Sequence, residues 1–181
     1  MCYANIDKIN CLEGRRKLEK YKKLIVFYSY TGHTKMIAEI IKEKLNCDIL
    51  ELKPCVPYSD DYDQVVEDEQ NSGSSQHIPS IQEISIDLNL YEEIILGTPT
   101  WWYRPCPVIR SFLLNYDLSH KIIIPFATNA GWLGRTFSEI KKLCPNSKVE
   151  KGLNIVFTEN YKENKMVTSM EEVQEFIHKL L

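Results

Sequence analysis

The sequence predicts an α/β fold of the doubly wound type, with helices on both faces of one parallel sheet. Short apolar runs rich in strand-forming residues alternate along the chain with amphipathic segments of helical period. Most connections between them are short, which suits right-handed crossovers between parallel strands. The length of 181 residues suits one domain with a sizeable core. We therefore expect three layers built around a five-stranded parallel sheet.

The first predicted strand and helix lie within residues 23–45. The run 24–28 is apolar and rich in β-formers, which is typical of a strand buried on both faces. Residues 36–45 carry apolar side chains at helical spacing, so one side of this helix would face the sheet. The turn between them would point backbone N–H groups outward at the positive end of the helix dipole, which favours an anion. The turn contains no Lys or Arg, so a phosphate held there would keep nearly its full charge.

The region after the second strand is acidic and irregular. Residues 58–80 contain six acidic residues and no Lys or Arg. A short helix is expected over 62–70, followed by a flexible tip at 71–75. Asp60 and Asp61 resemble a metal or phospho-acceptor pair, but no His or Cys cluster nearby supports ligation. We therefore favour a solvated acidic face for this region.

The remaining elements continue the alternation. The other strands are predicted over 48–52 at a sheet edge, 92–97, 121–127 and 149–158. Further helices are predicted to begin at Pro105 or Pro107, to run over 137–144 and to end the chain over 170–180. Thr168 and Glu171 would form a capping box before the last helix. Residues 1–22, whose second half is basic, are expected to be an N-terminal extension of a domain at 23–181.

Composition and charge exclude several classes of protein. The net charge of −3 argues against a nucleic-acid binder, which usually carries a basic surplus. The apolar runs are too short to cross a bilayer, and polar residues interrupt the N-terminus where a signal peptide would need an apolar core. We therefore expect a cytoplasmic protein without a membrane span. The six cysteines are scattered without a CxxC pair, which favours isolated thiols over a zinc site or a redox pair.

Two further loops carry residues suited to a flat aromatic ligand. Residues 98–103 follow a strand end and contain three consecutive aromatic residues between prolines. These side chains cannot all enter one core, so we expect at least one to face a ligand. Stacking of an aromatic side chain on a flat ring gains about 1 kcal/mol beyond the burial of area. The loop 128–134 follows the fourth strand and offers hydroxyl, amide and backbone N–H groups for a polar ring edge.

The three loops together resemble the flavodoxin-like family. Residues 29–34 match the flavodoxin phosphate loop Thr/Ser-x-Thr-Gly-x-Thr at all four fixed positions. Residues 97–102 match Gly-x-Pro-x-Trp-Trp, a motif of the short bacterial flavodoxin-related FMN-binding proteins. Residues 128–134 are similar to the third motif, Thr-x-Gly-Gly-Ser-Gly-x-Gly. The chain departs from that third motif at Ala130, Trp132 and Leu133, which replace small or hydroxyl residues. The resemblance covers about residues 23–181.

The resemblance implies a flavodoxin-like sheet of strand order 2-1-3-4-5, with FMN bound at the carboxyl ends of the strands. It assigns the FMN phosphate to Ser29, Tyr30, Thr31, Gly32, His33 and Thr34. It assigns the isoalloxazine ring to Thr98, Pro99, Thr100, Trp101, Trp102 and Tyr103. It assigns the polar edge of the ring to Thr128, Asn129 and Gly131, with Trp132 able to close over the pocket. Apart from this assignment, His33 is expected to be an exposed loop residue.

The resemblance also implies an electron carrier that meets a redox partner protein or a small electron acceptor, as a monomer or homodimer. One alternative is a small NAD(P)H-dependent FMN reductase acting on quinones or similar acceptors, and whether the protein is an enzyme stays open. The lack of a separate nicotinamide motif favours the carrier. Another alternative is a cofactor-free binding module, which the altered third loop supports. A phospho-receiver fits poorly, because Tyr28, Ser29 and Gly97 stand where it needs acidic residues. An unneutralised phosphate and the acidic segment would disfavour negative charge on the flavin.

Overall fold

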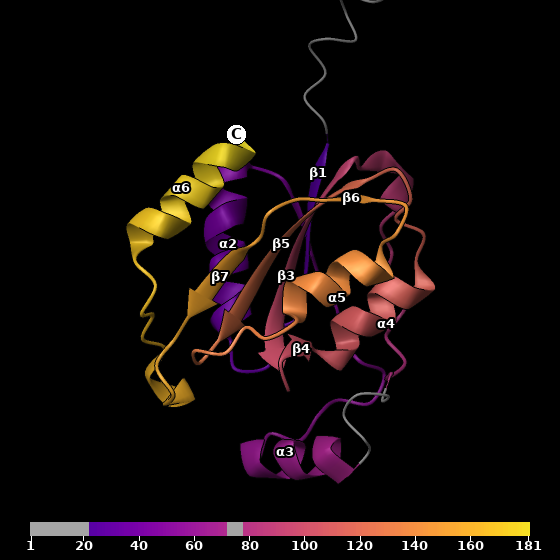
Figure 1. Ribbon diagram of the computed structural model, residues 1–181. Coiled ribbons are helices and arrows are strands. Elements are labelled where there is room, and N and C mark those ends of the chain that lie inside the picture. The colour runs from indigo at the N-terminus through magenta and orange to yellow at the C-terminus, as the bar shows by residue number, and fades with distance from the viewer. Residues whose placement is uncertain (1–21, 72–77) are drawn as a thin grey trace, which may run out of the picture.

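The computed structural model describes residues 22–71 and 78–181 of the chain (Figure 1). Residues 1–21, and with them nearly all of the expected N-terminal extension, lie outside the described residues. Most of the expected flexible tip does so as well, because the described chain breaks off after Asn71.

The sheet has the predicted architecture. Its strands lie in the order β2-β1-β3-β5-β6, and β7 pairs in parallel with the part of β5 that follows its pairing with β6. The strands are β1 Lys23–Phe27, β2 Asp48–Glu51, β3 Glu93–Trp101, β4 Arg104–Pro105, β5 Ile122–Asn129, β6 Lys148–Val149 and β7 Leu153–Val156. Because β6 and β7 pair with successive halves of β5, they form one interrupted fifth strand. The predicted five-stranded parallel sheet of order 2-1-3-4-5 is confirmed, and the short antiparallel β4 completes a sheet of seven strands.

Helices cover both faces of this sheet. The helix α2 (His33–Leu45) packs with α6 (Met170–Leu180) on one face, and α4 (Pro107–Asn115) packs with α5 (Thr136–Leu143) on the other (Figure 1). The two cores divide β1 by the alternation of a strand: Ile25 and Phe27 join the α2 side, while Leu24 and Val26 join the α4 side. None of the helices in 22–71 and 78–181 is long and apolar enough to cross a bilayer.

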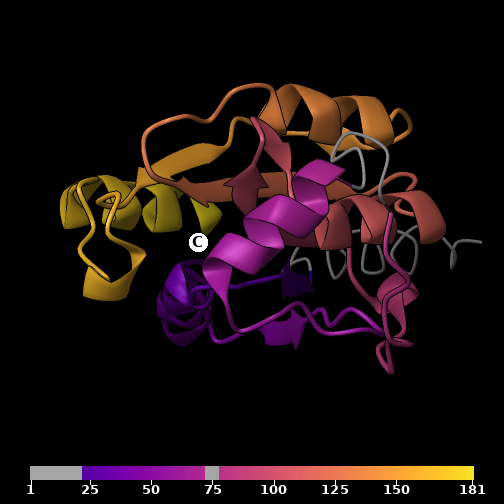
Figure 2. The same ribbon diagram turned by 90° about the horizontal axis from the view of Figure 1, so that it is seen from below.

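The helix α3 (Tyr62–Asn71) confirms the prediction of a helix over 62–70, but it lies on neither face of the sheet. Both views place it across the carboxyl ends of the strands, beyond the edge where the arrows end (Figures 1 and 2). Only Val65 and Glu69 of this helix are buried. The acidic stretch therefore adds a cover to the rim of the sheet instead of a third helix to a layer.

Two local predictions are wrong. The third strand continues past Gly97 to Trp101, because Thr98 and Pro99 pair in parallel with β5. The capping box of α6 uses Ser169 and Glu172, one residue later than Thr168 and Glu171. The reason is that the Thr168 hydroxyl already accepts a hydrogen bond from the Val156 N–H at 2.8 Å, which ties Thr168 to β7.

Candidate functional site

Three turns meet at the carboxyl ends of the strands, as the sequence predicts. The Thr34 and Thr128 hydroxyl oxygens lie 2.7 Å apart, which joins the first turn to the third. The Tyr30 and Trp101 rings meet edge to face with centroids 5.9 Å apart, which joins the first turn to the second. The Arg135 N–H donates to the Tyr103 carbonyl oxygen at 2.7 Å, which joins the second turn to the third. The predicted convergence is confirmed.

The first turn leaves the start of α2 open to an anion. Gly32 precedes the helix in the left-handed region, with φ of 94°, and no side chain caps the helix there. The first turn of α2 has no acidic residue, and a Cβ at Gly32 would meet nothing within 4 Å. The Ser29 hydroxyl oxygen is buried and has no hydrogen-bond partner among the described residues. A buried hydroxyl without a partner costs about 1–3 kcal/mol, so a hydrogen bond from a bound group would stabilise this turn.

The second turn is a strained hairpin between β3 and β4. Trp101 pairs with Arg104, and the two residues between them, Trp102 and Tyr103, have φ of 46° and 64°. A two-residue hairpin of this kind needs positive φ at both central positions, where Asn and Gly are usual and bulky residues are strained. Gly134 allows the hairpin to pack closely against it. A Cβ at this position would lie 2.2 Å from the Cβ of Tyr103.

A cavity of about 220 Å³ lies between this hairpin and α3. It is lined by Tyr30, Tyr62, Val65, Val66, Thr100, Trp101 and Trp102. The Trp101 ring is partly buried and packs edge to face on Tyr28, Tyr30 and Tyr58, with a centroid distance of 5.0 Å to Tyr58. Trp101 therefore anchors the wall of an aromatic slot whose opposite side comes from α3.

A second cavity, of about 370 Å³, continues from the slot toward the start of α2. It is lined by Tyr30, Thr31, Asp60, Tyr62, Lys162 and Asn164. The two cavities share Tyr30 and Tyr62, so they are neighbours that lie between Thr31 of the first turn and the two tryptophans. A further cavity of about 470 Å³ lies behind Tyr58 and touches none of the three turns. We place the candidate site in the first two cavities because they lie between the first turn and the aromatic slot.

Comparison with known proteins identifies the family of this chain. The sequence profile of the family described as Flavodoxin matches residues 22–173 of the chain. The chain belongs to the flavodoxin family. No curated protein matches it in sequence.

Solved structures agree with the fold of this flavodoxin. A candidate flavoprotein from Bacteroides uniformis is 24% identical with a TM-score of 0.72, over 88% of this chain and 99% of that one. A flavoprotein from Lactobacillus acidophilus, solved in complex with FMN, is 27% identical with a TM-score of 0.62, over 75% and 93% of the two chains. Oxidised Flavodoxin 2 from Bacillus cereus is 21% identical with a TM-score of 0.51, over 87% and 95%.

Not every predicted site residue of this flavodoxin faces the cavities. Thr98 is fully buried, and its hydroxyl accepts from the Cys106 N–H at 3.1 Å and donates to the Pro99 carbonyl at 2.8 Å. Thr34 and Thr128 are buried and hold each other. Thr34, Thr98 and Thr128 therefore support the rim from below and do not line the cavities.

His33 corrects one expectation from the sequence. It is the first residue of α2, it is buried, and its ring stacks on Phe157 with centroids 4.0 Å apart and planes 5° from parallel. The expected exposed loop histidine is therefore wrong. The stack packs the segment after β7 against the start of α2, which brings that segment beside the first turn.

The third turn is ordered by its own side chains. The Asn129 side-chain oxygen accepts the Gly131 N–H at 2.8 Å, and its amide donates to the Asn154 side-chain oxygen at 2.6 Å. Trp132 is 73% exposed and does not close over the slot. The flavodoxin thus presents an open third turn next to the aromatic slot.

Sequence reasoning missed part of the lining. Tyr62, Val65 and Val66 come from the acidic stretch, and Lys162 comes from the segment after β7. The aromatic and valine residues inside an otherwise acidic stretch were the available signal for α3. Lys162 had none, because only the fold brings it to the first turn.

The titratable groups at the rim favour stacking and hydrogen bonding over acid–base chemistry. Burial raises the pKa of Tyr28, and burial followed by the charge of Glu69 raises that of Tyr58. Burial raises the pKa of the Cys106 thiol to about 12. These three groups stay protonated near neutral pH, so they serve as packing and hydrogen-bonding groups.

Proposed function

We propose that this flavodoxin binds FMN in the two joined cavities and carries electrons between a donor and a redox partner protein or small acceptor. The observation that carries the proposal is the pair of neighbouring cavities that share Tyr30 and Tyr62, one lined by Thr31 of the first turn and the other by Trp101 and Trp102. Family membership and the FMN complex of the Lactobacillus acidophilus flavoprotein support it. Bound FMN supplies the one- and two-electron chemistry, and the protein positions and tunes it.

The phosphate group suits the first turn. Ser29, Tyr30, Thr31, Gly32, His33 and Thr34 form this turn and the start of α2. A phosphate there would accept hydrogen bonds from the uncapped N–H groups of the helix, where the dipole favours negative charge. It would also give the buried Ser29 hydroxyl the partner that it lacks in the described chain. The fit therefore rests on a group that the fold leaves unsatisfied.

The isoalloxazine ring suits the aromatic slot. Trp101 and Trp102 would face it from the strained hairpin, and α3 would cover it through Tyr62 and Val65. An offset stack on indole contributes on the order of 1 kcal/mol beyond area burial, and the helix keeps water from the covered face. Thr98, Pro99, Thr100 and Tyr103 complete the proposed ring loop, with Thr98 acting from beneath.

The polar edge of the ring is proposed to meet the third turn. Thr128, Asn129 and Gly131 would present its donors. The Gly131 N–H, which now donates to the Asn129 side chain, would exchange that acceptor for a ring oxygen. The open third turn leaves the ring edge accessible, which suits electron exchange with a partner.

We assign this function to a domain of residues 23–181, with residues 1–22 as an extension, acting in the cytoplasm. The test uses the purified full-length chain. An absorption spectrum should show bound flavin that is released on denaturation, and titration with FMN should quench flavin fluorescence. A protein that neither carries flavin nor binds added FMN would refute the proposal.

A second measurement separates the carrier from a reductase. NAD(P)H alone should leave the flavin of a carrier oxidised, because no separate nicotinamide motif appears in the sequence. Rapid bleaching of the flavin by NAD(P)H, with turnover of quinones, would instead assign the chain as an FMN-dependent reductase.

A further inference from the structure

The segment after β7 lies against the phosphate turn. The stack of Phe157 on His33, with centroids 4.0 Å apart, fixes the beginning of this segment over the start of α2. The 3-10 helix η2 (Tyr161–Glu163) follows, and the Asn160 side chain caps it by accepting the Lys162 N–H at 3.2 Å. The ring stack and the capped 3-10 helix thus order this segment, which lies close to the start of α2.

Lys162 lines the cavity that lies next to the proposed phosphate turn. It lines the 370 Å³ cavity together with Thr31, whose backbone belongs to the proposed phosphate site. Asn164, on the same cavity, follows η2 in the left-handed region with φ of 48°. The first turn contains no Lys or Arg, but the fold supplies a cation from a segment about 130 residues later in the sequence.

We infer that Lys162 is the cation that recognises the FMN phosphate, so that the protein selects phosphorylated over unphosphorylated flavin partly by charge. The inference rests on the proposed FMN binding and adds to it a residue outside the phosphate loop. An ammonium on a flexible stem reaches a phosphate as a point charge, and charge-assisted hydrogen bonds are about twice as strong as neutral ones.

Asp60 lines the same cavity and acts in the opposite direction. Its carboxylate repels a phosphate and attracts the Lys162 ammonium, so it lowers the affinity for the phosphate. A phosphate of nearly two negative charges competes for the ammonium better than a carboxylate of one, and it also meets the helix start of α2. The pair therefore predicts effects of opposite sign: loss of Lys162 weakens FMN binding, and loss of Asp60 strengthens it.

The test compares FMN with riboflavin, which lacks the phosphate. Dissociation constants are measured by flavin fluorescence for the wild-type chain and for Lys162→Gln, Lys162→Arg, Lys165→Gln and Asp60→Asn. Lys165 is the matched control, because it lies exposed in the same segment and does not line the cavity. Lys162→Gln should weaken FMN roughly tenfold, as expected for one charge-assisted contact to a partly exposed anion. Lys162→Arg should restore most of this loss, and Lys165→Gln should have no effect.

Riboflavin affinity should stay unchanged in all variants, and added salt should weaken FMN binding less in Lys162→Gln than in the wild-type chain. Asp60→Asn should tighten FMN a few-fold. If Lys162→Gln leaves the ratio of FMN to riboflavin affinity unchanged, or weakens both flavins equally, the inference is overturned while FMN binding stands. If the wild-type chain binds neither flavin, the proposed function fails and the inference fails with it.

Discussion

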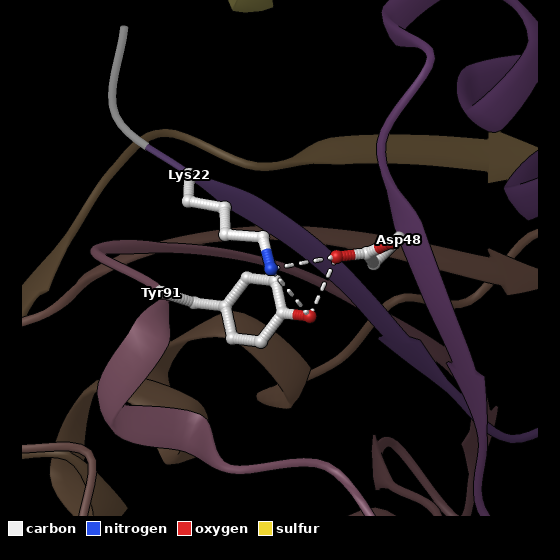
Figure 3. Close-up of polar contacts among 3 residues, drawn as sticks. All are labelled: Lys22, Asp48 and Tyr91. Atoms are coloured by element: carbon white, nitrogen blue, oxygen red, sulfur yellow. Dashed lines mark hydrogen bonds and ion pairs between the residues drawn. The ribbon is translucent and has the colours of Figure 1, made fainter. Parts of the chain in front are cut away.

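The two ends of the sheet differ in how completely their polar groups are satisfied. At the amino end, Lys22, Asp48 and Tyr91 come from just before β1, from the start of β2 and from just before β3 (Figure 3). The Tyr91 hydroxyl donates to the Asp48 carboxylate at 2.6 Å, and the Lys22 ammonium lies 3.2 Å from the same oxygen and 4.5 Å from the Tyr91 ring centroid. Three strands are thus tied together by groups that pair with one another.

Lys121, just before β5, completes this end. Its buried ammonium donates to the carbonyl oxygens of Leu88 and Tyr91, at 2.8 and 2.7 Å. Lys23 and Glu93, facing each other on β1 and β3, add an ion pair. The amino end therefore has its charges matched within the protein, which suits a purely structural role.

The carboxyl end shows the reverse. The Ser29 hydroxyl has no hydrogen-bond partner among residues 22–71 and 78–181, Trp102 and Tyr103 have positive φ, and two cavities lie beside them. Strain and unmatched polar groups persist only where the surrounding structure holds them, and they gather at functional sites. The described polar groups of the amino end pair with one another, whereas strain and cavities gather at the carboxyl end, where we propose that FMN binds.

The largest expected effect tests how the strained end is held. Gly134→Ala places a Cβ 2.2 Å from the Tyr103 Cβ and 2.7 Å from its backbone, at a φ of 57°. The left-handed conformation and the clash together should cost about 3 kcal/mol of unfolding free energy, measured by urea denaturation, and should abolish tight FMN binding. For stability alone the control is Gly131→Ala: Gly131 also has a positive φ, of 120°, but a Cβ there meets nothing within 4 Å, so its loss of unfolding free energy should be smaller. Equal losses of unfolding free energy in the two variants would show that the close approach of Gly134 to Tyr103 does not stabilise the hairpin.

The next effect belongs to the amino end alone. Lys121→Met leaves the Leu88 and Tyr91 carbonyl oxygens without their buried donor and should lower the unfolding free energy by about 2 kcal/mol. The FMN dissociation constant of the folded variant should not change, since the site lies at the other end of the sheet. The control Lys141→Met, on the exposed side of α5, should change neither the unfolding free energy nor the FMN dissociation constant. If the fully folded Lys121→Met variant binds FMN more weakly, the two ends of the sheet are not independent.

Ser29→Ala tests the unsatisfied group itself. Removing a buried hydroxyl without a partner should leave the stability of the flavin-free protein unchanged or raise it by up to about 1 kcal/mol. FMN affinity should fall roughly tenfold, because the phosphate loses a donor, while riboflavin affinity stays constant. Thermal unfolding and flavin titration measure the two quantities. A less stable flavin-free variant would mean that Ser29 already has a structural partner.

The smallest effect sharpens the comparison through pH. The Tyr91 hydroxyl, followed by the Lys22 ammonium, lowers the pKa of Asp48 below its ordinary 3.8. This contribution to stability is fully present above pH 3.8 and is lost as pH falls through the lower pKa of the folded state. The stability difference between wild type and Asp48→Asn should therefore be constant from pH 5 to 7 and shrink below pH 4. Because Asp48 is exposed, the difference should be small, and urea midpoints across this range measure it. A difference that grows in acid would contradict the assignment.

Local patterns in the sequence were enough to predict the layers of the fold and the turn at 29–34. Residues 24–28 and 36–45 carry contiguous apolar patterns, and a strand or a helix needs only such local periods to be recognised. The loop 29–34 is read in the same way, since its hydroxyls and Gly32 lie within a few residues of one another. Even the helix near 62–70 follows from local composition.

The surroundings of that turn depend on contacts between segments far apart in the chain. The burial of His33 depends on Phe157, and the place of Lys162 depends on the same contact between segments far apart in the chain. The capping box uses Ser169 and not the predicted Thr168, because the Thr168 hydroxyl accepts the Val156 N–H of β7. In each case the decisive neighbour lies at a long sequence separation, and a local pattern carries no information about which distant group will arrive beside it. The packing of α3 over the tryptophans has the same origin.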